Sequence, residues 1–208
     1  MIENEHRWLQ WAQRIQAIAQ TGLTYAKDEY DLERYEELRE LSIEMIMEQT
    51  GQPYAVVKEL FASESGYPTP KVDVRGVVFE DGKLLLVKER SDGKWALPGG
   101  WADVGYTPKE SVVKEIREET GLEVRAVRLL AVLDKKCHPH PPQPFYVYKI
   151  FIACERIGGR LQPSLETSET AYFGEDELPE LSLDRNTESQ IRSMFEYMRN
   201  PGKEIVLD

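Results

Sequence analysis

Three glutamates near the middle of the chain, Glu115, Glu118 and Glu119, have the side-chain type and the spacing to hold a metal ion. On an ideal helix, positions i, i+3 and i+4 lie on one face. Like charges at this spacing oppose helix formation by roughly 0.2–0.5 kcal/mol per pair, and a divalent cation reverses that effect. Carboxylates with no Cys or His nearby favour Mg²⁺, Mn²⁺ or Ca²⁺ over zinc. A solvated helix face, neutralised by Lys114 and Arg117, is the alternative.

Local signals predict the helix that carries these glutamates. Thr107 can cap it, Pro108 occupies the first turn, and Glu110 completes a capping box. Gly121 predicts its end. The apolar residues that should pack against the rest of the domain lie on an adjacent side: Val112, Val113 and Ile116.

The spacing in and around this helix resembles the signature of the Nudix hydrolase family. Gly100 begins the signature, and residues 114–122, KEIREETGL, end it. The likeness also includes WALPGGW at 95–101 and YFGEDELPEL at 172–181. It therefore extends over residues 72–181.

Two positions depart from the family signature. Lys114 stands where Arg is usual, which keeps the charge but loses the planar fork that holds carboxylates in two places. Tyr106 replaces a supporting Glu, and its phenol can instead form a hydrogen bond or stack on substrate. We expect activity to survive in weakened form. A non-catalytic Nudix-like sensor is the alternative.

The resemblance implies a fold and a metal site. The fold would be an α/β/α sandwich around a mixed sheet, preceded here by a small all-α N-terminal domain. Glu115, Glu118 and Glu119 would coordinate Mg²⁺ or Mn²⁺, and the carbonyl of Gly100 would add a ligand.

Many family members add an acidic residue from a later loop, just before an aromatic pair. Glu166 is the first candidate and Glu169 the second, with Tyr172 and Phe173 as the pair. The alternative is that both are solvent-exposed loop glutamates.

The implied chemistry is in-line attack of water on phosphorus, with metal ions withdrawing charge and lowering the pKa of bound water. The base that accepts the proton would be Glu118, Glu119 or Glu166, among which the sequence does not choose. Lys114 would hold the carboxylates in place.

Residues outside the signature must recognise the rest of the substrate. The candidates for substrate binding are Arg75, Arg90, Trp101 and His138. Alternatively, the tryptophan belongs to the core and the strand arginines point to solvent. A zinc site at Cys137, His138 and His140 is disfavoured, because a fourth ligand and the usual spacing are missing.

The part of the chain that carries these residues is predicted to alternate strands with helices. Strands are expected over residues 72–80, 83–90, 122–134 and 145–156. Asp81-Gly82 predicts a two-residue hairpin, and Gly158-Gly159 a tight turn. A last helix over 187–199 would bury Ile191, Met194, Phe195 and Met198.

The N-terminal third is predicted to be helical. The first helix would end near Gly22 and bury one stripe: Trp8, Trp11, Ala12, Ile15 and Ile18. A second helix over 28–51 would bury Leu32, Tyr35, Leu38, Met45 and Ile46. A short third helix over 53–65 and a linker rich in Gly and Pro lead to a boundary between domains 1–66 and 67–208.

The helical extension is similar to that of a Nudix subgroup described as ADP-ribose or CDP-choline pyrophosphatases. That likeness implies cleavage inside the pyrophosphate to a nucleoside monophosphate and a phosphorylated partner. We expect CDP-choline somewhat ahead of ADP-ribose, because Tyr146 and Tyr148 offer aromatic faces for a quaternary ammonium.

Charge and composition limit the partners. The formal net charge is −11, and residues 1–66 contain six Lys or Arg and thirteen Asp or Glu, so DNA binding is not expected. A homodimer formed through Trp8, Trp11 and Met45 is predicted, the alternative being packing on the chain's own Nudix domain. Two cysteines and the lack of a long apolar run predict a cytoplasmic protein that does not cross a membrane.

Overall fold

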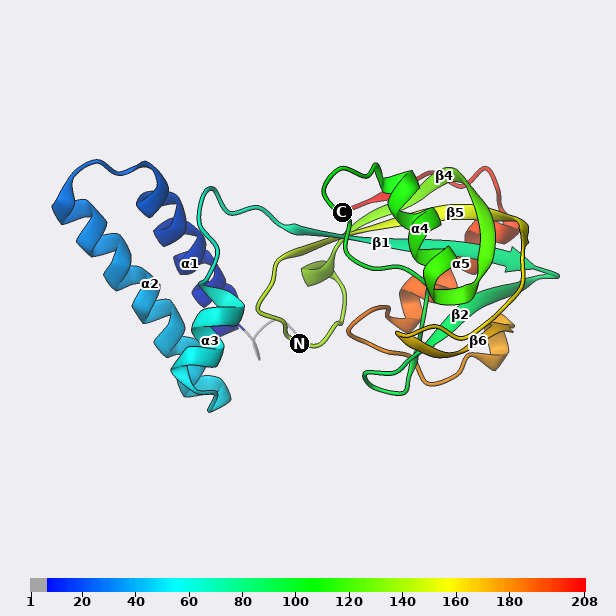
Figure 1. Ribbon diagram of the computed structural model, residues 1–208, viewed down its shortest axis with the longest axis horizontal. Coiled ribbons are helices and arrows are strands. Elements are labelled where there is room, and N and C mark those ends of the chain that lie inside the picture. Colours follow the sequence, from blue (N-terminus) through cyan, green and yellow to red (C-terminus); the bar gives the residue numbers. More distant parts are fainter. Residues whose placement is uncertain (1–6) are drawn as a thin grey trace. The chain divides into compact units, whose positions relative to one another are not determined.

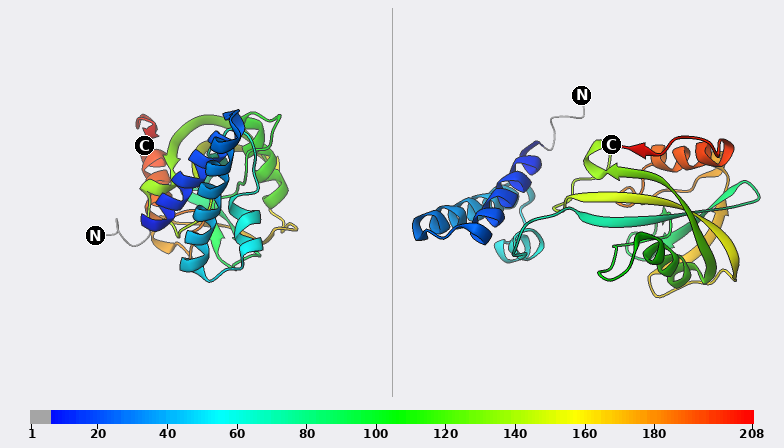
Figure 2. Two further views of the ribbon diagram at one scale, coloured as in Figure 1. Left: turned by 90° about the vertical axis from the view of Figure 1, so that its left-hand side faces the viewer. Right: turned by 90° about the horizontal axis from the view of Figure 1, so that it is seen from above.

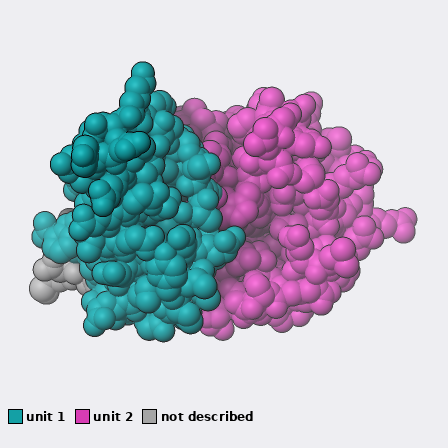
Figure 3. Space-filling model, turned by 60° about the vertical axis from the view of Figure 1, so that its left-hand side comes forward, with its two compact units in different colours: residues 1–70, 142–146 teal, residues 71–141, 147–208 magenta. Residues whose placement is uncertain are grey.

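The computed structural model describes residues 7–208, so the first six residues of the predicted domain 1–66 lie outside the described residues (Figure 1). The contacts divide the chain into two compact units, coloured separately in Figure 3. Unit 1 runs to residue 70 and includes 142–146, and unit 2 comprises 71–141 and 147–208. The predicted boundary after residue 66 stays a prediction.

The regular elements of unit 1 are all helices, whereas unit 2 combines strands and helices, as is typical of an α/β fold. The helices are α1 (Arg7–Tyr25), α2 (Glu29–Thr50), α3 (Tyr54–Phe61), α4 (Pro108–Thr120) and α5 (Glu188–Arg199), with short 3₁₀ turns η1 (Lys135–Cys137) and η2 (Glu175–Glu177). The strands are β1 (Lys71–Glu80), β2 (Lys83–Glu89), β3 (Trp95–Ala96), β4 (Leu122–Asp134), β5 (Val147–Gly159), β6 (Thr167–Phe173) and β7 (Val206–Leu207). Within residues 7–208, no helix is long and apolar enough to cross a membrane.

Unit 1 is a bundle of three helices around its own core. The buried apolar residues are Leu9, Ala12, Ile43, Ile46, Val57 and Ala62. Trp8 and Met45 pack against this core. Asp28 caps α2 through hydrogen bonds from the Tyr30 and Asp31 N–H groups, and Gly51 ends it in the left-handed conformation with φ +66°.

The predicted buried stripe of α1 is partly wrong. Ala12 is buried, but Trp11 and Ile18 are 48% and 56% exposed. The helix also continues past the predicted end near Gly22, to Tyr25. At Gly22 the Tyr35 ring lies against the helix backbone, where a Cβ would come within 2.3 Å of it. The residues that α1 buries are Leu9, Ala12, Gln16, Ala19 and Gln20.

Unit 2 contains one mixed sheet with the strand order β3-β2-β1-β5-β4-β7, and β6 also pairs with β2. The pairs β1·β5 and β4·β7 are parallel, and the others are antiparallel. Asp81 and Gly82 both have positive φ, +51° and +75°, which confirms the predicted hairpin between β1 and β2. The predicted turn at Gly158-Gly159 is wrong: both glycines belong to β5 and pair with the start of β4.

Helices cover both faces of this sheet, as the edge-on view in Figure 2 shows. Strand β1 alternates its side chains: Val74 and Val78 join the core under α4, and Val77 joins the core under α5. The α5 core includes the predicted Ile191, Met194 and Phe195, with Met198 packed against it. The predicted α/β/α sandwich with helical N-terminal extension is therefore confirmed.

Candidate active site

Helix α4 begins and ends where its local signals predict. The Glu110 N–H donates to Thr107 Oγ1 at 3.3 Å, and the Thr107 N–H donates to Glu110 Oε2 at 2.8 Å. Pro108 is in the first turn, and Gly121 ends the helix with φ +74°. This capping fixes the register of the helix, and thus the direction in which its glutamates point.

Glu119 is the most buried carboxylate of the helix, with 4% of its surface exposed. Its Oε2 accepts the Gly99 N–H at 2.8 Å. Gly99 has φ +139°, and a Cβ there would lie 2.0 Å from the Val74 carbonyl oxygen, so only glycine fits. Burial raises the pKa of Glu119 to about 8, although Arg75 and the Gly99 N–H act in the opposite direction.

Glu115 faces the glycine loop. A Cβ on Gly100 would lie 2.9 Å from Glu115 Oε2, so the carboxylate rests directly against that backbone. The Gly100 carbonyl accepts the Val74 N–H at 2.9 Å and keeps a second lone pair. Burial, reinforced by Glu118 and Glu166, raises the pKa of Glu115.

Glu118 and Lys114 lie on the solvent side of the same helix. Lys114 Nζ is 2.9 Å from Asp103 Oδ2 and 3.5 Å from Glu118 Oε2. Its charge also lies 5.7 Å from the centre of the Tyr106 ring. The hydrogen bond to Asp103 raises the pKa of Lys114. The two departures from the signature thus contact each other, and Lys114 still reaches a carboxylate of the triple.

The two candidates for a later acidic residue have different surroundings. Glu166, in the loop before β6, is close enough to Glu115 and Glu89 to raise the pKa of both carboxyls. Its backbone carbonyl accepts the Arg90 N–H at 3.0 Å. Glu169, on β6, instead forms an ion pair with Lys88 at 2.7 Å.

Glu89, at the end of β2, is a fifth carboxylate that sequence reasoning missed. It is 5% exposed and forms an ion pair with Arg185, Oε1 to Nε, at 2.7 Å. Burial raises its pKa, and it acts in turn on Glu119. The sequence gave no indication that Glu89 is buried, because its ion-pair partner Arg185 lies almost a hundred residues later in the chain.

Arg75 is buried rather than facing solvent. Its Nε and Nη2 each lie 2.9 Å from Asp73 Oδ1, and its Nη1 donates to the Leu97 carbonyl at 3.1 Å. Lys149 pairs with the other Asp73 oxygen. The positive charge of Arg75 lowers the pKa of Glu119 toward its usual value.

The other predicted substrate-binding residues are more dispersed. Trp101 is 50% exposed and follows the glycine loop beside β1. The Arg90 guanidinium donates to the Ser164 carbonyl at 3.2 Å, in the same loop as Glu166. His138 lies apart from the carboxylates, at the β7 edge of the sheet, where its Nε2 is 2.9 Å from Asp208 Oδ2.

His140 has hydrogen-bond partners other than Cys137 and His138. Its Nδ1 is 2.6 Å from the Leu183 carbonyl, and its Nε2 is 3.1 Å from the Gln190 amide. Burial lowers its pKa to about 4. Across residues 7–208, no three His, Cys, Asp or Glu side chains converge as a ready metal-binding set.

The carboxylate cluster nevertheless fits a hard divalent cation in its chemistry. Its donors are carboxylate oxygens and one backbone carbonyl, and the pKa of Glu89, Glu115 and Glu119 is raised above the usual range. A nearby cation would favour the ionised forms and relieve this cost. We use "carboxylate cluster" below for Glu89, Glu115, Glu118, Glu119 and Glu166.

An α/β/α sandwich whose capped helix presents glutamates to a glycine loop defines a Nudix-type hydrolase. Residues 69–196 match the model of the NUDIX domain, and residues 6–61 match the UDP-X-like, N-terminal oligomerisation domain. The chain belongs to the Nudix family. It is an enzyme of the pyrophosphatase class, which confirms the family prediction.

Relatives and solved structures resemble the chain over most of its length. The Bacillus subtilis (strain 168) protein YjhB, whose name proposes an ADP-ribose pyrophosphatase, is 50% identical over 100% of both chains. An ADP-ribose pyrophosphatase of Methanocaldococcus jannaschii is 35% identical over 64% of this chain and 76% of its own. The structure of a UDP-X diphosphatase is 38% identical, covers 97% of this chain and 98% of its own, and has a TM-score of 0.64.

Proposed function

We propose that the chain hydrolyses the pyrophosphate of a nucleoside diphosphate linked to a second group, releasing a nucleoside monophosphate and a phosphorylated partner. The observation that carries this proposal is the carboxylate cluster against the Gly99–Gly100 backbone. Two relatives named for ADP-ribose support ranking ADP-ribose ahead of CDP-choline, which reverses our first expectation.

The cluster would hold Mg²⁺ or Mn²⁺ through Glu115, Glu118, Glu119 and the Gly100 carbonyl. Such an ion, when bound, supplies charge withdrawal from phosphate oxygens and acidifies water. The protein's own part is positional: Gly99 fixes one oxygen of Glu119, and Lys114 with Asp103 restrains the exposed Glu118. We expect hydrolysis to stop in EDTA and to return with Mg²⁺. Hydrolysis that persists in excess EDTA would overturn the metal assignment.

Glu166 is our choice for the residue that accepts the proton from water. It is exposed and lies close enough to Glu115 and Glu89 to raise the pKa of both, whereas Glu169 is held in an ion pair with Lys88. Glu166→Gln should lower kcat by about 10²-fold or more. Glu169→Gln is the matched control and should leave kcat within about twofold. If the two variants behaved alike, Glu118 or Glu119 would replace Glu166 as the base.

Substrate recognition would involve Trp101 and Arg90, which lie on the two loops beside the cluster. The half-exposed Trp101 ring can stack on a base or sugar. Trp101→Ala should raise KM more than it lowers kcat. Arg75, being buried, would act by positioning Glu119 rather than by touching substrate, and His138 drops out of the proposed substrate site.

A substrate panel tests the activity as a whole. ADP-ribose, CDP-choline, a UDP-sugar, NADH and a nucleoside triphosphate should be compared by kcat/KM with Mg²⁺, and the products separated by chromatography. We expect a nucleoside monophosphate from the preferred substrate. A preference for the triphosphate with release of inorganic pyrophosphate would overturn the proposed substrate class.

Self-association through unit 1 is the second part of the proposal, and we propose a homodimer. Its support is the match of residues 6–61 to an oligomerisation domain, together with the exposed apolar side chains of α1. Light scattering at micromolar concentration should give twice the chain mass of 24.0 kDa. A cytoplasmic location stays a prediction.

A further inference from the structure

Helix α1 carries an exposed apolar stripe that the core of unit 1 does not use. Trp11, Ile18 and Tyr25 follow each other at intervals of seven residues and are 48%, 56% and 64% exposed. Seven residues are nearly two turns of helix, so the three side chains lie in one row along the axis. The row crosses most of the length of α1, and at Trp11 the Arg7 guanidinium lies 5.3 Å from the ring.

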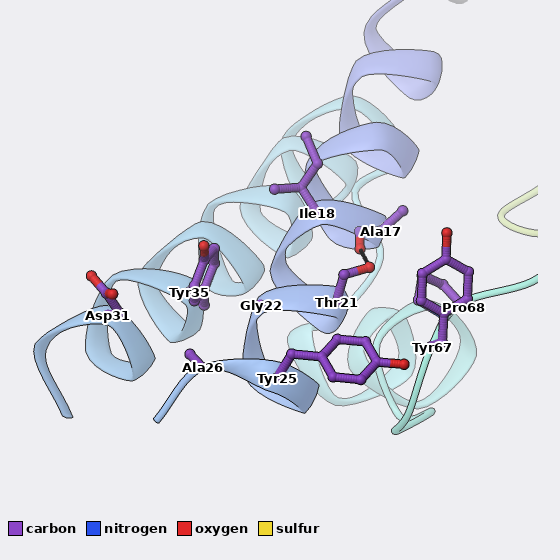
Figure 4. A pocket seen from close by; sticks show the side chains of 10 residues that line it. All are labelled: Ala17, Ile18, Thr21, Gly22, Tyr25, Ala26, Asp31, Tyr35, Tyr67 and Pro68. Carbon is purple, nitrogen blue, oxygen red and sulfur yellow. Dashed lines mark hydrogen bonds between the residues drawn. The ribbon is translucent and has the colours of Figure 1, made fainter. Parts of the chain in front are cut away.

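A hollow of about 590 Å³ adjoins the C-terminal half of this row (Figure 4). Its walls come from α1, from the start of α2 and from the segment after α3, and its lining includes Ile18, Gly22, Tyr25, Asp31 and Tyr67. The Tyr25 and Tyr67 rings lie 6.5 Å apart and form its aromatic side. The lack of a side chain at Gly22 deepens the floor, where the Tyr35 ring lies.

Charge on the two sides of the row is complementary. Helix α1 contains no Asp or Glu between Arg7 and Tyr25, and Arg14 is exposed between Trp11 and Ile18. The opposite wall of the hollow contributes Asp31, whose present ion pair with Arg34 is solvent-exposed and therefore weak. A surface that is basic at one end and acidic at the other is self-complementary under a two-fold rotation.

We propose that a second copy of this chain docks here, with the two α1 helices antiparallel and Ile18 at the two-fold axis. This inference rests on the proposed self-association and specifies its contact surface. When Ile18 meets its own copy in antiparallel packing, Trp11 meets the partner's Tyr25, and Arg14 faces the partner's Gly22 at the floor of the hollow. Trp11 of each copy thus lies at the edge of the hollow in the other copy, and each Arg14 approaches the partner's Asp31. Of the three residues first expected at the interface, only Trp11 takes part, because Trp8 and Met45 pack against the core of unit 1.

Cysteine cross-linking tests the position of the axis. Two Cα atoms must come within about 7 Å for a disulfide to form, so only residues at the axis can link to their own copies. In a Cys137→Ser background, which removes the exposed native thiol, Ile18→Cys should form a disulfide-linked dimer under mild oxidation. Leu41→Cys, 46% exposed on α2, is the matched control and should stay unlinked.

Charge reversal tests the predicted contact of Arg14 with Asp31. Arg14→Glu and Asp31→Arg should each raise the dimer dissociation constant by about tenfold or more, and the double variant should recover most of the loss. Trp11→Ala should weaken the dimer at least as much. All three positions are exposed, and circular dichroism would verify that each variant folds.

The outcomes separate this surface from the rest of the proposed function. A monomeric wild type at high micromolar concentration would overturn self-association and this surface together. A dimer in which Ile18→Cys fails to link, or in which the double charge reversal recovers nothing, would overturn the surface alone. The hydrolysis assay with the substrate panel reports on the carboxylate cluster and is decided separately.

Discussion

Glu119 is a carboxylate that the fold buries almost completely. Its replacement by an uncharged residue should lower activity and raise stability. Burial raises its pKa from the usual 4.5 to about 8. Between these two values the folded chain binds more protons than the unfolded chain, so stability falls as the pH rises through this window. Above pH 8 the folded protein carries the full cost of a buried charge.

The change Glu119→Gln removes that cost while keeping the oxygen that accepts the Gly99 N–H. The pKa shift corresponds to an upper limit of ~5 kcal/mol, at about 1.4 kcal/mol per unit. Since water entry relieves part of this cost, we expect a gain of about 2–3 kcal/mol at pH 8 and little gain at pH 4.5. At the same time kcat should fall by about 10²-fold or more, because an anionic ligand is lost.

Urea-dependent hydrogen exchange of the β5 amides, measured in EDTA, reports the stability of unit 2 by itself. Glu118→Gln is the matched control: its side chain is 60% exposed, so it should lower kcat without a gain in stability. Mg²⁺ should stabilise the wild type more than the Glu119 variant. The reasoning would be refuted by a variant less stable than the wild type at pH 8, or by one that keeps more than about half its kcat.

Three further changes test the network and the helix around the site. Asp73→Asn leaves two buried cations without their full counter-charge and should cost about 3–5 kcal/mol in urea unfolding. The exposed Arg125→Ala should cost under about 1 kcal/mol, and equal losses would contradict the role of burial. Burial lowers the pKa of Lys149 to about 8, so the folded chain binds fewer protons than the unfolded chain between pH 8 and 10.5. Stability should therefore rise across this window, and Lys149→Met should flatten the rise in a pH series of melting curves. Thr107→Ala should cost about 1 kcal/mol by calorimetry, and a change under about 0.3 kcal/mol would show that its capping box does not fix α4.

The features that local sequence determines were predictable. The limits of α4 follow from Thr107, Glu110 and Gly121, and the hairpin from Asp81-Gly82. The periodic apolar residues of α5 also identified its buried face. Each of these signals lies within a few residues of the structure it determines, so no knowledge of the remaining chain was needed.

The features that depend on distant partners were not predictable. Arg75 and Asp73 are buried together on β1, with Lys149 of the neighbouring strand β5 as the second partner of Asp73, and the buried Glu89 is paired with Arg185 from a late loop. In α1, periodicity alone did not separate the face that packs on α2 from the row of Trp11 and Ile18. The buried face instead includes two glutamines, Gln16 and Gln20, whose hydrogen bonds to Ser42 and to the Gly66 carbonyl depend on distant residues.

The mixed sheet of unit 2 cannot be completed until β5 has been synthesised. β5 lies between β1 and β4, yet both of those strands, and α4 between them, are synthesised first. A growing chain that ends before residue 147 therefore lacks the strand with which both β1 and β4 pair in the finished sheet. Such edges invite wrong pairing, and their closure waits on contacts between distant parts of the chain, which form slowly. The glutamates of α4 are thus synthesised before the sheet beneath them can be completed, and we expect the need for chaperones to be greatest in that interval.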